Sequence, residues 1–384
     1  MIYLDNQATT ACDKRVLAVM LPFFTERFGN PHSAEHALGR DAQDAVETAR
    51  AQLATAIGAD PREIAFTSGA TEANNLAIKG VAHHSRQQED PRRRVITLAT
   101  EHKCVLESVA ALAAEGFEPV VLPVDADGLL DLGRLRAALV TPTLLVSVMA
   151  ANNETGVLQD LAAISAMTRA AGALLHTDAA QMLGKLPFAV ADIDLASFSA
   201  HKLYGPKGVG ALYVRRRPRT RLTPLFSGGG QERGLRSGTL PTPLIAGFGE
   251  AARLAVAGMA EEQARLTRLR GRLLDGLMAG LPGLRVNGSW DHRLPGNLNV
   301  TLPHGSALEL MRRAPNLCLS TGSACSSAEV EPSYVLAAMG LSPLDAARTL
   351  RLGLGRFTSA ADVDGAIDAI RAAYHSFAIE PVEA

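Results

Sequence analysis

The chain has 384 residues, 47% of them hydrophobic and 20% charged, and its 38 Lys and Arg residues balance 39 Asp and Glu residues. This length is comfortable for two domains, and a net charge of −1 gives no general attraction to nucleic acid or to an acidic membrane. The expected partners are therefore a small molecule or another protein, with no DNA and no membrane.

Neither a targeting segment nor a membrane span is expected. The first residues, Met-Ile-Tyr-Leu-Asp, contain no basic segment that leads into an apolar one. The most apolar run, residues 140–151, is interrupted by polar residues and proline and is too short to cross a bilayer. We expect a soluble, cytoplasmic protein.

The four cysteines are Cys12, Cys104, Cys318 and Cys325, and they form no C-x-x-C pair. No histidine or second cysteine pair lies at metal-ligand spacing beside them, so no metal site is expected. A disulfide framework is not expected in so large a cytoplasmic chain either. Each cysteine has to be interpreted by its own surroundings.

Short apolar runs alternate with helical patterns over the first two thirds of the chain. Strands are predicted at residues 64–67, 95–99, 119–123, 144–150, 173–177, 194–199 and 210–214. Helices are predicted between them, for example at 41–57, 73–82 and 161–171. Continuous apolar strands separated by helices indicate a mostly parallel sheet covered on both faces. The fold class is therefore α/β, with a large domain over residues 15–245.

The pattern changes after residue 245. Residues 246–280 are predicted to form one long helix, strands are predicted at 298–302, 317–319 and 350–354, and a helix is predicted near the end. This order is typical of a smaller α+β domain. We assign residues 246–384 to it, together with residues 1–14.

An anion site is one interpretation of residues 66–74, where a strand ends, a turn of small residues follows and a helix begins. Free backbone N–H groups at a helix start bind phosphate, and the Thr71 hydroxyl lies among them. Ordinary capping of the helix by Ser68 or Thr71 is the more common explanation of such residues.

Two further strand ends suggest a cofactor cradle. Asp178 follows an apolar strand, at the edge where α/β sheets bind ligands, although it could simply cap the next helix. Lys202 ends another strand, where a lysine is ordinarily exposed, but Ser199 and His201 flank it. A desolvated lysine can form a Schiff base with an aldehyde cofactor, and an aspartate can keep a pyridine nitrogen protonated.

The segment around Cys325 is small and polar, Ser-Thr-Gly-Ser-Ala-Cys-Ser-Ser. A structural cysteine prefers apolar neighbours, as Cys318 has, whereas a reactive thiol has to be reachable. The local sequence leaves both interpretations of Cys325 open.

The motifs together resemble those of cysteine desulfurases of the NifS/IscS type. The matching segments are residues 4–10, 28–31, 67–72, 100–103, 152–156, those around Asp178 and Lys202, 236–239 and 323–327. They run in order through nearly the whole chain, and the ordered set is far more specific than any one segment. The resemblance implies a fold-type-I pyridoxal-phosphate enzyme of the class V aminotransferase superfamily that works as a homodimer.

The resemblance also implies a role for each matching residue. Lys202 would bind the cofactor covalently, Asp178 would pair with the pyridine nitrogen, and His102 would stack on the ring and carry a proton. Cys325, in a loop over about residues 320–333, would receive the sulfur. The remaining roles are Asn153 and Gln181 near the ring hydroxyl, Ala70, Thr71, Ser199, His201 and the neighbouring subunit's Thr239 at the phosphate, and Arg351 with Asn153 at the substrate.

The implied reaction converts L-cysteine to L-alanine and leaves a persulfide on Cys325. The long form of the cysteine loop is similar to that of relatives that pass sulfur to an iron–sulfur scaffold protein. This chain ends soon after its last predicted helix, which puts the tail-mediated docking of some relatives in doubt. The basic run at residues 215–221 could be a partner surface or merely a solvated strand end.

Two rival functions share the same fold. A selenocysteine lyase or an aminotransferase would need Lys202 and Asp178 but no thiol at Cys325. A non-catalytic docking protein would need none of these residues, so their presence favours an enzyme.

Overall fold

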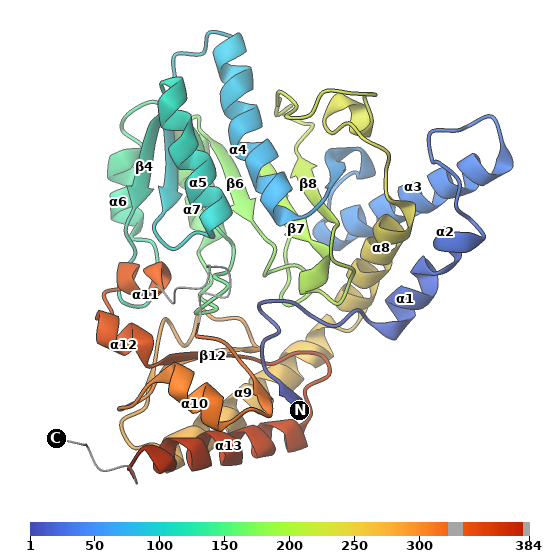
Figure 1. The fold of residues 1–384 in the computed structure, drawn as a ribbon. Coiled ribbons are helices and arrows are strands. Elements are labelled where there is room, and N and C mark those ends of the chain that lie inside the picture. The colour runs from blue at the N-terminus through green and yellow to red at the C-terminus, as the bar shows by residue number, and fades with distance from the viewer. Residues whose placement is uncertain (322–332, 379–384) are drawn as a thin grey trace.

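The computed structural model describes residues 1–321 and 333–378. Its large sheet, in the upper half of Figure 1, has the strand order β2-β8-β7-β6-β5-β3-β4. These strands are β2 (Ile64–Thr67), β3 (Arg94–Leu98), β4 (Glu118–Leu122), β5 (Thr143–Ser147), β6 (Leu174–Asp178), β7 (Leu195–Ser199) and β8 (Gly210–Val214). β8 runs antiparallel to its neighbours β2 and β7, and every other neighbouring pair is parallel. The predicted α/β fold with a mostly parallel sheet is confirmed.

Helices cover both faces of this sheet because its strands are apolar on both sides. Alternate residues of a strand point to opposite faces: Phe198 of β7 packs in one core cluster and Leu195 in another. The first cluster includes residues of α3 (Ala37–Ile57), α7 (Leu161–Ala170) and α8 (Thr242–Ala257). The second includes residues of α4 (Ala70–Gln87) and α5 (Lys103–Ala111). The other helices of this part are α1 (Lys14–Met20), α2 (Pro22–Thr25) and α6 (Leu132–Ala138).

A separate apolar core forms from the C-terminal third of the chain. Its antiparallel sheet has the order β12-β10-β9, built from β9 (Arg285–Val286), β10 (Asn297–Thr301) and β12 (Thr349–Gly353). The helices here are α9 (Met259–Gly280), α10 (Ala307–Arg313), α11 (Tyr334–Ala338), α12 (Pro343–Ala347) and α13 (Ala360–His375). Most of them lie in the lower half of Figure 1, below the large sheet.

The N-terminal segment belongs to this second core. β1 (Ile2–Tyr3) pairs in parallel with β11 (Leu317–Cys318), and Leu4 is fully buried among the C-terminal leucines. The domain limits given above, 15–245 against 1–14 with 246–384, remain a prediction.

The prediction of a single helix over residues 246–280 is wrong. Two helices occupy this stretch, and the chain leaves helical geometry at Gly258, whose φ is −99° and ψ is 3°. Glycine is a poor helix former, and here the break lets the two helices serve different cores. α8 packs against α3, whereas α9 packs against α13.

Within the described ranges, no helix combines the length and apolar character needed to cross a bilayer.

Candidate active site

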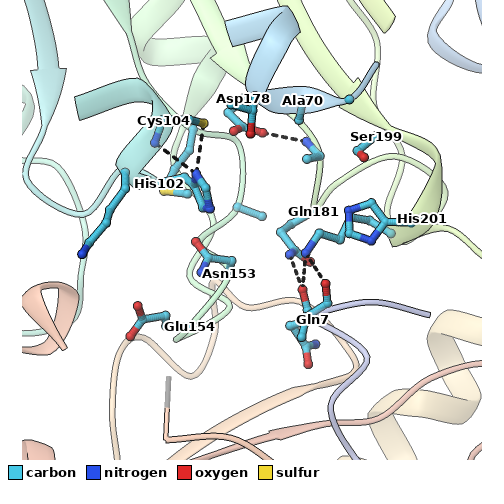
Figure 2. Close-up of a pocket in the computed structure, with 18 of the residues that line it drawn as sticks. Gln7, Ala70, His102, Cys104, Asn153, Glu154, Asp178, Gln181, Ser199 and His201 are labelled. Atoms are coloured by element: carbon cyan, nitrogen blue, oxygen red, sulfur yellow. Dashed lines mark hydrogen bonds between the residues drawn. The ribbon is translucent and has the colours of Figure 1, made fainter. Parts of the chain in front are cut away.

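A cavity of about 580 Å³ lies at the carboxyl ends of five parallel strands of the large sheet (Figure 2). This edge is where open α/β sheets usually bind ligands. Each of these strands delivers predicted site residues to the cavity wall. They are Ala70 and Thr71 after β2, His102 after β3, Asn153 after β5, Asp178 and Gln181 from β6 onward, and Ser199, His201 and Lys202 from β7 onward.

Lys202 lies in a short 3-10 helix, Ala200–Lys202, that follows β7 directly. Its Nζ donates to the main-chain oxygens of Gln7 at 2.6 Å and Ala8 at 2.7 Å. The lysine side chain therefore points toward the N-terminal segment. A lysine held in this way presents an amine inside a ligand-sized cavity, as a Schiff-base lysine requires.

Asp178 is the last residue of β6 and is 6% exposed. Its Oδ2 accepts a hydrogen bond from Asn74 Nδ2 at 2.7 Å, and its Oδ1 accepts one from the Ala180 N–H at 2.9 Å. Both donors are neutral amides, so they orient the carboxylate without neutralising its charge. The carboxylate is suited to pair with a cationic ring nitrogen.

His102 is the N-cap residue of α5 and stands at the cavity wall. Its Nδ1 accepts the Cys104 N–H at 3.2 Å and lies 3.0 Å from Cys104 Sγ. Burial lowers the pKa of His102, the charge of Asp178 opposes this shift, and the charge of Lys202 adds to it. The imidazole is therefore neutral at neutral pH.

The start of α4 lines one end of the cavity and is suited to bind an anion. Its N-cap residue is Gly69, and no side chain caps the N–H groups of the first turn. The capping by Ser68 or Thr71 considered above therefore does not occur. Free N–H groups at the start of an 18-residue helix attract phosphate. Ser199 and His201 line the same cavity, and burial lowers the pKa of His201 to about 4, so that it is neutral.

Asn153 and Gln181 present amides to the cavity. Asn153 Oδ1 is buried and has no hydrogen-bond partner within the described residues, so a ligand with a donor would satisfy it. Gln181 Nε2 donates to Gln7 O at 2.9 Å, and its Oε1 accepts Lys185 Nζ at 2.8 Å. Burial lowers the pKa of Lys185 to about 7.

Arg351 reaches the cavity from β12, in the other core. Its side chain is 2% exposed, and its guanidinium donates to Asp5 Oδ1 at 2.7 Å and to Asn153 O at 3.2 Å. A guanidinium fixed beside a ligand cavity suits a substrate carboxylate.

One predicted residue, Thr239, does not line this cavity, and another lies outside the described residues. Thr239 is exposed and does not line it, so its predicted role in a second copy of the chain remains a prediction. Cys325 and the loop residues 322–332 lie outside the described residues. Cys12 packs against the first core and Cys318 lies in β11, in keeping with structural roles.

Sequence reasoning missed two buried carboxyl groups, of which Glu154 lines the cavity. Glu101 is fully buried, accepts the Met149 N–H at 2.6 Å, and burial raises its pKa well above the usual value. Glu154 lines the cavity and accepts Ser333 Oγ at 2.5 Å, and burial raises its pKa too. Both carboxyls belong to segments that match relatives, but nothing local distinguishes them from surface acids.

The basic run at residues 215–221 divides into two parts. Arg215 is buried and pairs with Asp194 at 3.3 Å, whereas Arg216, Arg217, Arg219 and Arg221 are exposed.

The described residues contain no group of three or more acidic, histidine or cysteine side chains that could hold a metal ion.

Comparisons with known proteins identify the family. The model of the aminotransferase class-V family matches residues 2–365. "Cysteine desulfurase IscS" of Anaeromyxobacter sp. (strain Fw109-5) is 54% identical over 365 residues, covering 94% of this chain and 90% of that protein. The chain belongs to the cysteine desulfurases of the class-V aminotransferase family.

Solved structures of the same family share the fold over nearly the whole chain. A protein named "NIFS-LIKE PROTEIN" superposes with a TM-score of 0.90 at 37% identity, covering 98% of this chain and 99% of that one. A second structure, "SspA in complex with cysteine", gives a TM-score of 0.82 at 38% identity, with 94% and 100% coverage. Members of this family are pyridoxal-phosphate enzymes, so the cavity has to be judged against that cofactor.

Proposed function

We propose that this chain is a pyridoxal-phosphate-dependent cysteine desulfurase that converts L-cysteine to L-alanine. One observation carries the proposal: in a member of this family, a lysine, a buried carboxylate, a neutral histidine and a buried arginine all line the same cavity. These are Lys202, Asp178, His102 and Arg351.

The donor set of the cavity fits the cofactor. The uncapped start of α4 suits a phosphate, Asp178 suits a pyridinium, and the unsatisfied Asn153 oxygen suits a ring hydroxyl. Lys202 would hold the cofactor covalently, and His102 would lie against its ring. The phosphate would contact Ala70, Thr71, Ser199, His201 and Thr239 of a second copy, and the ring hydroxyl would contact Asn153 and Gln181.

The bound cofactor supplies an electron sink for the substrate Cα. The chain's own side chains supply binding and proton transfer. Arg351 orients the substrate through its carboxylate, with Asn153 beside it, and His102 exchanges protons at the cavity wall. The low exposure of Asp178 and Arg351 keeps water away from their charges and strengthens both contacts.

Sulfur transfer is assigned to Cys325. Its thiolate attacks the substrate sulfur, a new S–S bond forms, and the C–S bond of the substrate breaks. The electron pair of that bond stays with the three-carbon fragment, which gains protons and leaves as alanine. An acceptor thiol then takes the outer sulfur from Cys325. The acceptor proposed here is an iron–sulfur scaffold protein, and the active form proposed is a homodimer completed by Thr239.

The test is a product balance with purified protein, L-cysteine and a reductant. We expect sulfide and alanine in equal amounts, with many molecules of each formed per molecule of enzyme. An aminotransferase would instead convert cysteine into a keto acid without sulfide, and a docking protein would give neither product. Either result would overturn the proposal.

A further inference from the structure

A continuous chain of hydrogen bonds connects Asp178 with His102 through two side chains that the proposed reaction does not use. Asn74 Nδ2 donates to Asp178 Oδ2 at 2.7 Å and to Cys104 Sγ at 3.2 Å. Cys104 Sγ lies 3.0 Å from His102 Nδ1 (Figure 2). The residues come from three elements: α4, the end of β6 and the start of α5.

The direction of each bond in this chain is fixed by chemistry. A flipped Asn74 amide would set its oxygen against the Asp178 carboxylate, so Nδ2 has to face Asp178. The two Nδ2 hydrogens then go to the carboxylate and to the sulfur. Because the sulfur accepts from Asn74, its own hydrogen is available to His102.

The thiol of Cys104 has a hydrogen to give. Burial, as the largest cause, and the nearby charge of Asp178 together raise the pKa of Cys104 to about 12, although hydrogen bonds from Asn74 and Thr71 act in the opposite direction. Glu101 adds a smaller effect of the same sign as Asp178. Cys104 is therefore a thiol at neutral pH and a donor, not a nucleophile.

His102 Nδ1 thus faces two donors, the Cys104 thiol and the Cys104 backbone N–H at 3.2 Å. A nitrogen that receives two donors carries a lone pair, and the imidazole proton has to be on Nε2. The charged groups around the ring are Asp178 and Lys202, whose effects on its pKa are opposite in sign.

We propose that Cys104 is a positioning residue that fixes His102 in the Nε2–H tautomer, so that the resting enzyme presents a hydrogen-bond donor, and not a base, to the cavity. His102 can accept a proton on Nε2 only after the proton already there moves to Nδ1. The Cys104 thiol and the Cys104 backbone N–H oppose this move, because both donate to Nδ1. The inference deepens the proposed function, on which the role of His102 rests. It also implies that the proton of Cys325 needs an acceptor other than resting His102.

The first test reads the tautomer directly. The resting holoenzyme is labelled with ¹⁵N-histidine, and the His102 signals are assigned by their loss in His102→Gln. We expect a protonated Nε2 and a bare Nδ1 in the wild type. A proton on Nδ1 would overturn the proposal, and this measurement needs neither a core substitution nor turnover.

The second test compares Cys104→Ala, which removes the donor, with Cys104→Ser, which keeps one. In Cys104→Ala we expect a mixture of tautomers. The unprotonated ring also loses one neutral hydrogen bond. The apparent pKa of the acidic limb of the kcat/KM profile should therefore rise by roughly 0.5 to 1 pH unit. Cys104→Ser should restore the wild-type tautomer and the wild-type pH profile. Cys12→Ser, which replaces a thiol away from the cavity, should leave the tautomer and the pH profile unchanged.

A purely structural role of Cys104 predicts a different outcome. Both variants would then lower thermal stability, while tautomer and pH profile stayed as in the wild type, and the proposal would be wrong. If the wild-type tautomer is as expected but no sulfide forms, the proposed function fails and the positioning role stands.

Discussion

Replacing Arg351 with alanine tests how the cavity distinguishes substrate from cofactor. The guanidinium is 2% exposed and donates to Asp5 Oδ1 at 2.7 Å, so its orientation is set before a substrate arrives. A substrate carboxylate would lose a charge-assisted contact in a water-poor cavity. Such contacts contribute about 3 kcal/mol, which corresponds to a roughly 150-fold decrease in kcat/KM. Cofactor content should not change, because Arg351 lies on β12 of the other core and not at the strand ends proposed to hold the cofactor.

The assay is steady-state sulfide release across cysteine concentrations, with cofactor content measured by absorbance on the same samples. Arg351→Lys keeps the charge without the planar fork and should fall between the wild type and Arg351→Ala. Asp5→Asn keeps the guanidinium and removes only its carboxylate partner, so its kcat/KM should change less than tenfold, the equivalent of about 1.4 kcal/mol. If Arg351→Ala keeps its kcat/KM, or loses cofactor in proportion to activity with an unchanged KM, Arg351 is structural and the assignment fails.

Four further changes have defined outcomes. Borohydride should fix the cofactor to the wild type but not to Lys202→Ala, and persistent labelling would show that another lysine is used. Cys325→Ser should keep cofactor and bind cysteine but release essentially no sulfide, and mass spectrometry should find the added sulfur only on the wild-type peptide. Glu232→Gln should destabilise the fold by about 3 kcal/mol in urea, because it removes the buried counter-charge 2.7 Å from Arg50 and leaves only the exposed Glu47 carboxylate, 3.1 Å away, beside that guanidinium; an unchanged midpoint would contradict this. Burial lowers the pKa of Lys185 to about 7, so the unfolded chain holds one proton more than the folded chain between pH 7 and about 10. The free energy of unfolding should therefore rise with pH in this range, by up to about 1.4 kcal/mol per pH unit. Lys185→Met should lose this slope, and an equal slope in both proteins would refute the prediction.

The strand ends were predictable because the physics that defines them is local. An apolar run followed by a polar residue marks where a buried strand leaves the sheet, and Asp178 and Lys202 both fit this pattern. All seven predicted strands of the large sheet occur, with limits that differ by at most three residues from those expected. Once several parallel strands are placed, their carboxyl ends have to share one edge, and the cavity follows.

The partners of those residues were not predictable, because they are distant in sequence. Gln7 and Lys202 are 195 positions apart, and no local pattern indicates that a main-chain oxygen of one holds the amine of the other. The same holds for Asn74 and Asp178, 104 positions apart. The raised pKa of Glu101 follows from burial, which depends on the packing of the whole sheet. The break at Gly258 was missed because a single glycine inside a helical pattern is often tolerated.

The N-terminal segment explains how one cavity can need residues from both cores. Gln7 O accepts Lys202 Nζ and Gln181 Nε2, while Asp5, two residues earlier, accepts the Arg351 guanidinium. Residues 5–7 therefore contact the lysine expected to hold the cofactor and the arginine expected to hold the substrate. A shift of this segment would move both contacts together, and neither core could compensate alone. Besides the direct contact of Arg351 with Asn153 O, the position of the arginine relative to the lysine therefore depends on a short stretch of chain at the start of the sequence.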